Sequence, residues 1–152
     1  TAMRRMSSQM LRLRARYKNI IGVHIRQKDY KSASWKHLYI SPGRANQILD
    51  EYLQIAKDDS SDTLFLVFSD EKINGVIFTS KNVVLSRLSA IYDLYLLAMC
   101  DVVIGSNSTF GAFSAWHGNI PHIIMTNSKM DWNYYKNRST FFSNKYLLEK
   151  LY

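Results

Sequence analysis

The sequence has one cysteine, no long hydrophobic run and neither of the two common glycine-rich phosphate-binding motifs. The single thiol, Cys100, cannot form an internal disulfide, which suits a reducing compartment. No apolar stretch reaches the roughly 18 residues that a membrane-spanning helix needs. Neither the nicotinamide fingerprint G-x-G-x-x-G nor the Walker lysine motif of P-loop proteins is present. The hydrophobic content of 47% nevertheless excludes a disordered chain and predicts one domain with a proper core.

Acidic residues are missing from the first 18 positions, where six basic side chains gather. The whole chain has a net charge of +8, so the remainder after residue 20 carries only +2. This distribution argues against a nucleic-acid partner, which needs a basic face with interleaved aromatic residues. Residues 1–19 are therefore predicted to form a connecting basic helix, helical over 2–18, with solvated arginines. The alternative is peripheral contact with an anionic surface or an acidic partner.

Short apolar runs alternate with longer amphipathic stretches through the rest of the chain. Strands are predicted at 20–25, 63–68, 82–85, 102–104 and 122–125. Helices are predicted at 44–57, 88–99, 109–117 and 145–151, with a helical turn at 71–76 and a loop at 31–43. Strands that alternate with helices form βαβ units, so the fold class is α/β, a Rossmann-like domain with a mostly parallel sheet flanked by helices.

Polar residues follow every predicted strand at its C-terminal end. They are His24 and Arg26, Ser69 and Asp70, Ser86 and Arg87, the run 105–109, and Thr126. In a parallel sheet these ends share one edge, and ligands of open α/β sheets bind there. Loops also begin at strand ends, so part of this pattern is ordinary. The edge is nevertheless the predicted site.

The run 105–109, Gly-Ser-Asn-Ser-Thr, combines hydroxyls with the amides and positive dipole end of a following helix. Those are the components of a phosphate site, and the alternative is a simple Ser or Thr helix cap without a ligand. Arg26 can bind a diphosphate with two parallel hydrogen bonds, or else form a surface ion pair. We favour diphosphate binding for Arg26 because it follows a buried strand.

Asp93 interrupts an otherwise apolar helix and must find a partner or lie at an edge. The N1–H and N2–H₂ donors of guanine would satisfy this carboxylate, and a helix-dipole role is the alternative. The four histidines and Cys100 have no metal-ligand spacing, so no metal cofactor is expected. Arginine, backbone amides and a helix end are then expected to neutralise a diphosphate in place of Mg²⁺.

Three segments of the chain resemble sequence motifs of the fucosyltransferases. The segment 24–30, His-Ile-Arg-Gln-Lys-Asp-Tyr, is similar to the His-x-Arg-Arg-x-Asp-Tyr motif of α-1,2-fucosyltransferases and to a related motif of α-1,6-fucosyltransferases and NodZ-type enzymes. The segment 68–70, Phe-Ser-Asp, resembles the family's Phe-Ser-Asp block, and 93–110 with Ala115-Trp116 resembles its third block. The three occur in the family's order.

The resemblance implies the donor-binding, C-terminal half of a GT-B glycosyltransferase over residues 20–152. The implied reaction transfers fucose from GDP-fucose to a glycan hydroxyl with inversion and without a metal. Arg26 would hold the β-phosphate and stabilise the departing GDP, His24 would line the nucleotide pocket, and Asp70 would support the donor site. Asp93 would bind guanine. The remaining donor-binding residues would be Ser106, Asn107, Ser108, Thr109 and Phe110.

Asp29 is the candidate catalytic base beside Arg26, and an ion pair that orients Arg26 is the favoured alternative. Gln27 stands where the family has a second arginine, which predicts a weaker anion site. Because a GT-B enzyme needs a second, acceptor-binding domain, this half is expected to be inactive alone. The alternative function is a non-catalytic module that binds GDP or a nucleotide sugar. A glycan on the sequon at Asn107 would block the pocket, which favours a cytoplasmic location over a Golgi lumen.

Overall fold

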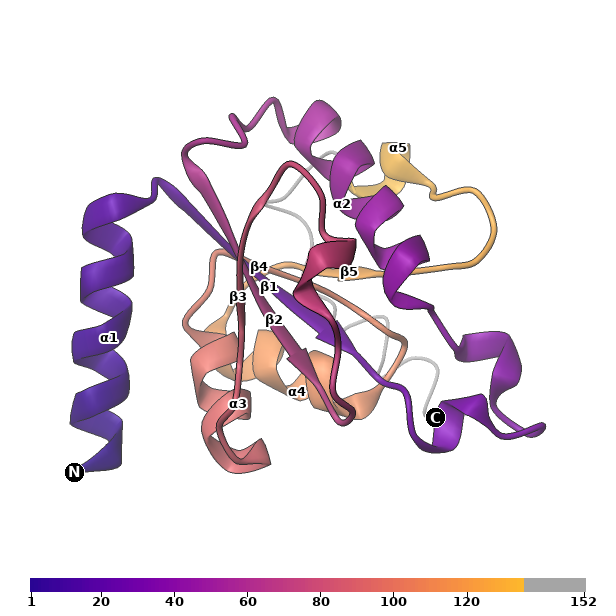
Figure 1. The fold of residues 1–152 in the computed structure, drawn as a ribbon, viewed down its shortest axis with the longest axis horizontal. Helices are drawn as coiled ribbons and strands as arrows, with labels where there is room; N and C mark the ends of the chain where they lie inside the picture. The colour runs from indigo at the N-terminus through magenta and orange to yellow at the C-terminus, as the bar shows by residue number, and fades with distance from the viewer. Residues whose placement is uncertain (136–152) are drawn as a thin grey trace.

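The protein is described by a computed structural model for residues 1–135, which form a parallel sheet between two layers of helices (Figure 1). The strands are β1 (Asn19–Ile25), β2 (Thr63–Ser69), β3 (Asn82–Leu85), β4 (Val102–Gly105) and β5 (His122–Ile124). The α-helices are α1 (Ala2–Arg16), α2 (Pro42–Ala56), α3 (Ala90–Ala98), α4 (Thr109–Gly118) and α5 (Trp132–Tyr135). Three short 3₁₀ helices are η1 (Asp29–Lys31), η2 (Lys36–Leu38) and η3 (Gly75–Ile77). The predicted α/β fold with a parallel sheet is confirmed.

The strands lie in the order β3-β2-β1-β4-β5, and every pair is parallel. β1 lies at the centre, where His24 is opposite Phe68 of β2 and Gly105 of β4. The strand order reverses between β1 and β4, because β2 and β3 extend to one side and β4 and β5 to the other. Ligands of such sheets bind in the crevice at the C-terminal ends of the strands where the order reverses.

Both faces of the sheet are buried, as the near-continuous apolar strands require. Ile21, Val23 and Ile25 of β1 belong to the core beneath α2, to which α5 contributes Trp132. Ile20 belongs to the opposite core, which also contains residues of α1, α3 and α4. Figure 1 shows α2 and α5 on one side of the sheet and α3 and α4 on the other. The side chain of His24 lies on the α4 side, stacked on Phe110.

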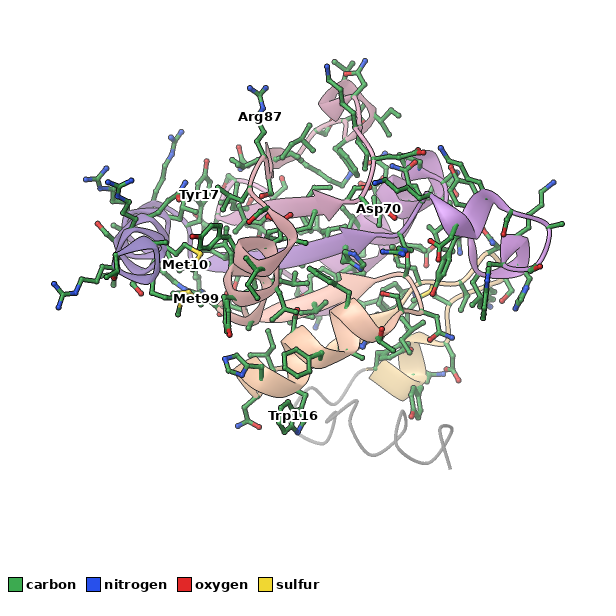
Figure 2. All side chains as sticks on the ribbon, turned by 90° about the horizontal axis from the view of Figure 1, so that it is seen from below. Met10, Tyr17, Asp70, Arg87, Met99 and Trp116 are labelled. Atoms are coloured by element: carbon green, nitrogen blue, oxygen red, sulfur yellow. The ribbon has the colours of Figure 1, made fainter. Side chains whose placement is uncertain are left out.

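The basic helix α1 is packed against the domain. Met6 and Met10 are buried, and Figure 2 shows Met10 between α1 and the rest of the domain. Arg14 Nη1 donates to both carboxylate oxygens of Asp101, at 2.7 and 2.6 Å, and Nη2 donates to Met99 O at 3.0 Å. Asp101 also accepts from the backbone N–H of Ile20 at 2.7 Å. One carboxylate therefore holds the end of α1 against the start of β1.

Several element boundaries differ from those predicted. α1 ends at Arg16 because Tyr17 is extended. α2 begins at Pro42, two residues early, because Ser41 Oγ accepts from the N–H of Arg44 at 3.1 Å and caps the helix. η1 and η2 interrupt the predicted loop at 31–43, while the helical turn predicted at 71–76 is found later, as η3 at Gly75–Ile77. The helix predicted at 145–151 lies outside the described residues. Within residues 1–135, no helix has both the length and the apolarity to span a membrane.

Replacement of Arg14 by alanine should destabilise the domain by about 1–2 kcal/mol, because three hydrogen bonds of a half-exposed arginine are lost. The matched control is Arg12→Ala on the exposed face of the same helix, which should change stability by less than about 0.5 kcal/mol. Urea unfolding followed by circular dichroism measures both. Equal effects of the two variants would show that α1 is not anchored through Asp101.

Candidate functional site

The C-terminal ends of β1 and β4 are joined by close backbone contacts. Ser106 N–H donates to His24 O at 2.9 Å, and Arg26 N–H donates to Ser106 Oγ at 3.0 Å. A Cβ atom on Gly105 would stand 3.1 Å from His24 O, so glycine permits this approach. Tyr30 Oη donates to Asn107 O at 2.6 Å and ties the two following loops together. The crevice at the strand reversal therefore has fixed walls.

Arg26 projects from the end of β1 between two carboxylates. Its Nε donates to Asp29 Oδ1 at 2.8 Å, while Asp70 Oδ2 lies 3.2 Å from the same Nε without accepting a hydrogen bond. The hydrogen bond to Asp29 raises the pKa of Arg26 and lowers the pKa of Asp29. Neither Nη atom donates a hydrogen bond to any residue among 1–135. The Nε side of the guanidinium is held by the carboxylates, and its two Nη atoms are available to bind an anion.

The first turn of α4 begins at the same crevice without a side-chain cap. Ser108 occupies the N-cap position, but its side chain makes no capping hydrogen bond. Its Oγ lies instead 3.5 Å from His24 Nδ1. Thr109, the first helical residue, is exposed. The amides of this turn are therefore open to an anion, and the predicted alternative of a simple side-chain cap is wrong.

Two buried histidines lie beneath this first turn. His24 stacks on Phe110 with ring centroids 4.7 Å apart, and His122 of β5 is 0% exposed. A Cβ atom on Gly111 would stand 3.2 Å from His122 Nε2 and 3.7 Å from His24 Nδ1. Burial lowers the pKa of each histidine to about 4. Both rings are consequently neutral at pH 7, and neither nitrogen of His122 has a hydrogen-bond partner among the described residues.

Asp93 lies in the first turn of α3 and is buried. Its Oδ1 accepts a hydrogen bond from the hydroxyl of Ser86, which follows β3. Burial raises the pKa of Asp93, although the Ser86 hydrogen bond opposes that shift. No contact among residues 1–135 joins Asp93 to Arg26 or its carboxylates. Asp93 and Ser86 thus form a second polar group on the same edge of the sheet.

Gln27, which stands where the family has a second arginine, is buried beside the site. The side chain is only 4% exposed, and its Nε2 donates to Ser69 Oγ at 3.0 Å. Its backbone N–H donates to Asp70 Oδ1 at 2.7 Å. The side chain therefore points into the protein, and the weaker anion site predicted from the missing arginine stays a prediction. The sequence placed Ser69 at the predicted edge and Tyr30 in the 24–30 motif without giving either a role, and it gave no signal for His122.

A cavity of about 440 Å³ lies beside Ser86 at the ends of β2 and β3. It is lined by Val67, Ser69, Glu71, Lys72, Ile73, Leu85, Ser86 and Arg87. Figure 2 shows Asp70 near the ends of the central strands, with Arg87 projecting away from the domain. Residues 1–135 contain no group of three histidine, cysteine or acidic side chains placed to bind one metal ion.

The family model of glycosyl transferase family 11 matches residues 2–146, which is nearly the whole sequence. The chain belongs to this family. Membership confirms the resemblance to the fucosyltransferase superfamily that the three motifs carried. No curated protein has a significantly similar sequence.

Solved structures support the fold of this family 11 domain. POFUT1 in complex with GDP aligns with a TM-score of 0.56 and 14% identity, over 80% of this chain and 46% of POFUT1. The apo form of POFUT1 aligns with a TM-score of 0.52 and 13% identity, over 80% and 46% of the two chains. NodZ α-1,6-fucosyltransferase soaked with GDP-fucose gives a TM-score of 0.46 and 19% identity, over 74% and 40%. The chain therefore spans less than half the length of these proteins.

The two neutral histidines predict a loss of stability in mild acid. Unfolded histidine titrates near pH 6.5, so between pH 6.5 and about 4 the unfolded chain binds more protons than the folded one. Each histidine then lowers the free energy of unfolding by about 3 kcal/mol at pH 4 relative to pH 7. The His122→Leu variant should lose about half as much stability between these pH values, because only His24 remains to titrate. At pH 7 it should be at least as stable as the wild type, because an unpaired polar ring is removed.

Thermal unfolding between pH 7.5 and 4 measures this effect. Exposed His37 supplies the control, because His37→Gln should leave the pH dependence of the wild type unchanged. A His122→Leu protein with the full wild-type pH dependence would contradict the assignment of a buried neutral ring.

Proposed function

We propose that this domain binds GDP-fucose and forms the donor half of an inverting fucosyltransferase that acts on a glycan hydroxyl without a metal. The observation that carries the proposal is the pairing of Arg26 with the uncapped N-terminus of α4. The Nη atoms of Arg26 make no hydrogen bond to the described residues, and the side chain of Ser108 does not cap the first-turn amides of α4. Both lie at the strand reversal, where the sheet topology favours a ligand.

A diphosphate matches the chemistry of these groups. Its α- and β-phosphates present several anionic oxygens, which a guanidinium binds in parallel and a helix N-terminus binds through amides and dipole. Ser106, Asn107, Ser108, Thr109 and Phe110 form the wall that would cradle it. Arg26 would also stabilise the charge that develops on GDP as the sugar departs. Family membership supports this donor, since the fucosyltransferase motifs of the sequence coincide with the open Arg26 and α4.

Two further carboxylates on the same edge would support the donor, Asp93 through the guanine base and Asp70 through Arg26. One oxygen of Asp93 accepts from Ser86, so the carboxylate retains capacity for the N1–H and N2–H₂ groups of guanine. Asp70 Oδ2 is buried 3.2 Å from Arg26 Nε, so Asp70 would support the donor site through Arg26. His24 and Phe110 would form the apolar wall of the nucleotide pocket.

The position of Asp29 favours an orienting role. The hydrogen bond from Arg26 lowers the pKa of its carboxyl, which makes it a weaker base. Its role as catalytic base stays a prediction. An acceptor-binding domain belongs to the proposal because the chain spans less than half of the similar structures. The second candidate is a module that binds GDP without catalysing transfer.

Arg26→Ala should weaken GDP binding about 100-fold, because the charged hydrogen bonds of a bidentate contact are lost. The matched control is Arg5→Ala, which removes the same charge from the exposed face of α1 and should leave the affinity within about twofold. Isothermal titration calorimetry with GDP and GDP-fucose measures both variants.

Three results of this titration test the donor site, and a transfer assay separates the two candidate functions. Loss of affinity in Arg26→Ala alone supports the donor site. Loss in Arg5→Ala alone would place the anion on α1. Binding of another sugar nucleotide by the wild type, with no binding of GDP or GDP-fucose, would contradict the donor assignment. Transfer by the wild type with a glycan acceptor would exclude the non-catalytic module.

A further inference from the structure

The side chain of Gln27 connects the ends of β1 and β2 through a short chain of hydrogen bonds. Its Nε2 donates to Ser69 Oγ at 3.0 Å, and Ser69 Oγ donates in turn to Ile25 O at 2.8 Å. Ser69 is the last residue of β2, and Ile25 is the last residue of β1. The amide of Gln27 therefore reaches across the sheet and back to the residue before Arg26.

The backbone of Gln27 makes the second half of this connection. Its N–H donates to Asp70 Oδ1 at 2.7 Å, and the other oxygen of Asp70 lies 3.2 Å from Arg26 Nε. Arg26 is thus fixed on both sides along the chain. Its own N–H is bonded to Ser106, and the next residue is bonded to Ser69 and Asp70.

We propose that Gln27 is a positioning residue that holds Arg26 toward the diphosphate through Ser69 and Asp70, and that it does not itself contact the anion. The proposal rests on the proposed function only in taking Arg26 as the phosphate ligand. Its physical basis is geometric, because a bidentate contact needs a guanidinium held at one angle and distance. A buried neutral amide can hold the turn without competing for the charge of Asp70.

An arginine at this position would act differently from the glutamine. A guanidinium has no room to stay solvated where Gln27 is 4% exposed, so it would either leave the interior or pair with Asp70. Pairing would remove Asp70 Oδ2 from Arg26, and leaving would break the bond to Ser69. Gln27→Arg should consequently bind GDP no more tightly than the wild type. A position that faced the ligand would gain affinity from the added charge.

The test is a double-mutant cycle measured as GDP affinity. Gln27→Met keeps the length of the side chain and removes its donor, so GDP binding should weaken about fivefold. In the Arg26→Ala background the same change should alter affinity by less than about twofold, because Gln27 acts through Arg26. Ser69→Ala should match Gln27→Met, and the Gln27→Met/Ser69→Ala pair should be no weaker than either alone. Circular dichroism confirms that each variant is folded.

A measurement without ligand tests the positioning of Arg26 separately from GDP binding. The Arg26 Nε–H proton is bonded to Asp29, so its NMR signal should be protected from exchange in the wild type. Gln27→Met should lower that protection, and Arg12→Ala should not. An unchanged Nε–H signal in Gln27→Met would overturn the positioning role. Tighter GDP binding by Gln27→Arg would also overturn it. An equal loss of GDP affinity on Gln27→Met in the wild-type and Arg26→Ala backgrounds would overturn it as well. Wild type that binds no GDP would instead contradict the proposed function.

Discussion

The contact between Arg26 and Asp70 joins the ends of the two neighbouring strands β1 and β2, and the candidate site depends on it. Asp70 accepts from the Gln27 amide with one oxygen and faces Arg26 Nε with the other. Asp29 takes the Nε hydrogen bond. Two carboxylates therefore hold a cation at the edge of the sheet before any ligand arrives. The two carboxylates face only the Nε atom of Arg26, which leaves its Nη atoms for an anion.

The surroundings of this cation are largely uncharged. α4 and β5 contribute no Asp, Glu, Lys or Arg, and the histidines beneath the first turn of α4 are kept neutral by burial. A phosphate at that turn would meet one fixed positive charge, a row of amides and a helix dipole. Such a site neutralises a diphosphate by preorganised groups and needs no reorganisation of water. Arg14 of α1 has another role, since it anchors that helix through Asp101.

Much of this arrangement could be predicted from the sequence, because apolar periodicity decides which segments become strands and where each one ends. The convergence of His24, Arg26 and Asp70 follows from parallel strands alone. Strand order could not be read, since it depends on which face each crossover helix covers. The inward turn of Gln27 was also hidden, because its direction is set by Ser69 and Asp70 more than forty residues away. The catalytic roles and the cytoplasmic location stay predictions.

A crystal structure of the protein with GDP tests the central claim most directly. The account predicts β-phosphate oxygens about 2.7–2.9 Å from the Nη atoms of Arg26, and phosphate oxygens on the amides that begin α4. Asp29 and Asp70 should remain on the Nε side. GDP bound in the cavity at the ends of β2 and β3, with no phosphate on Arg26 or α4, would contradict it.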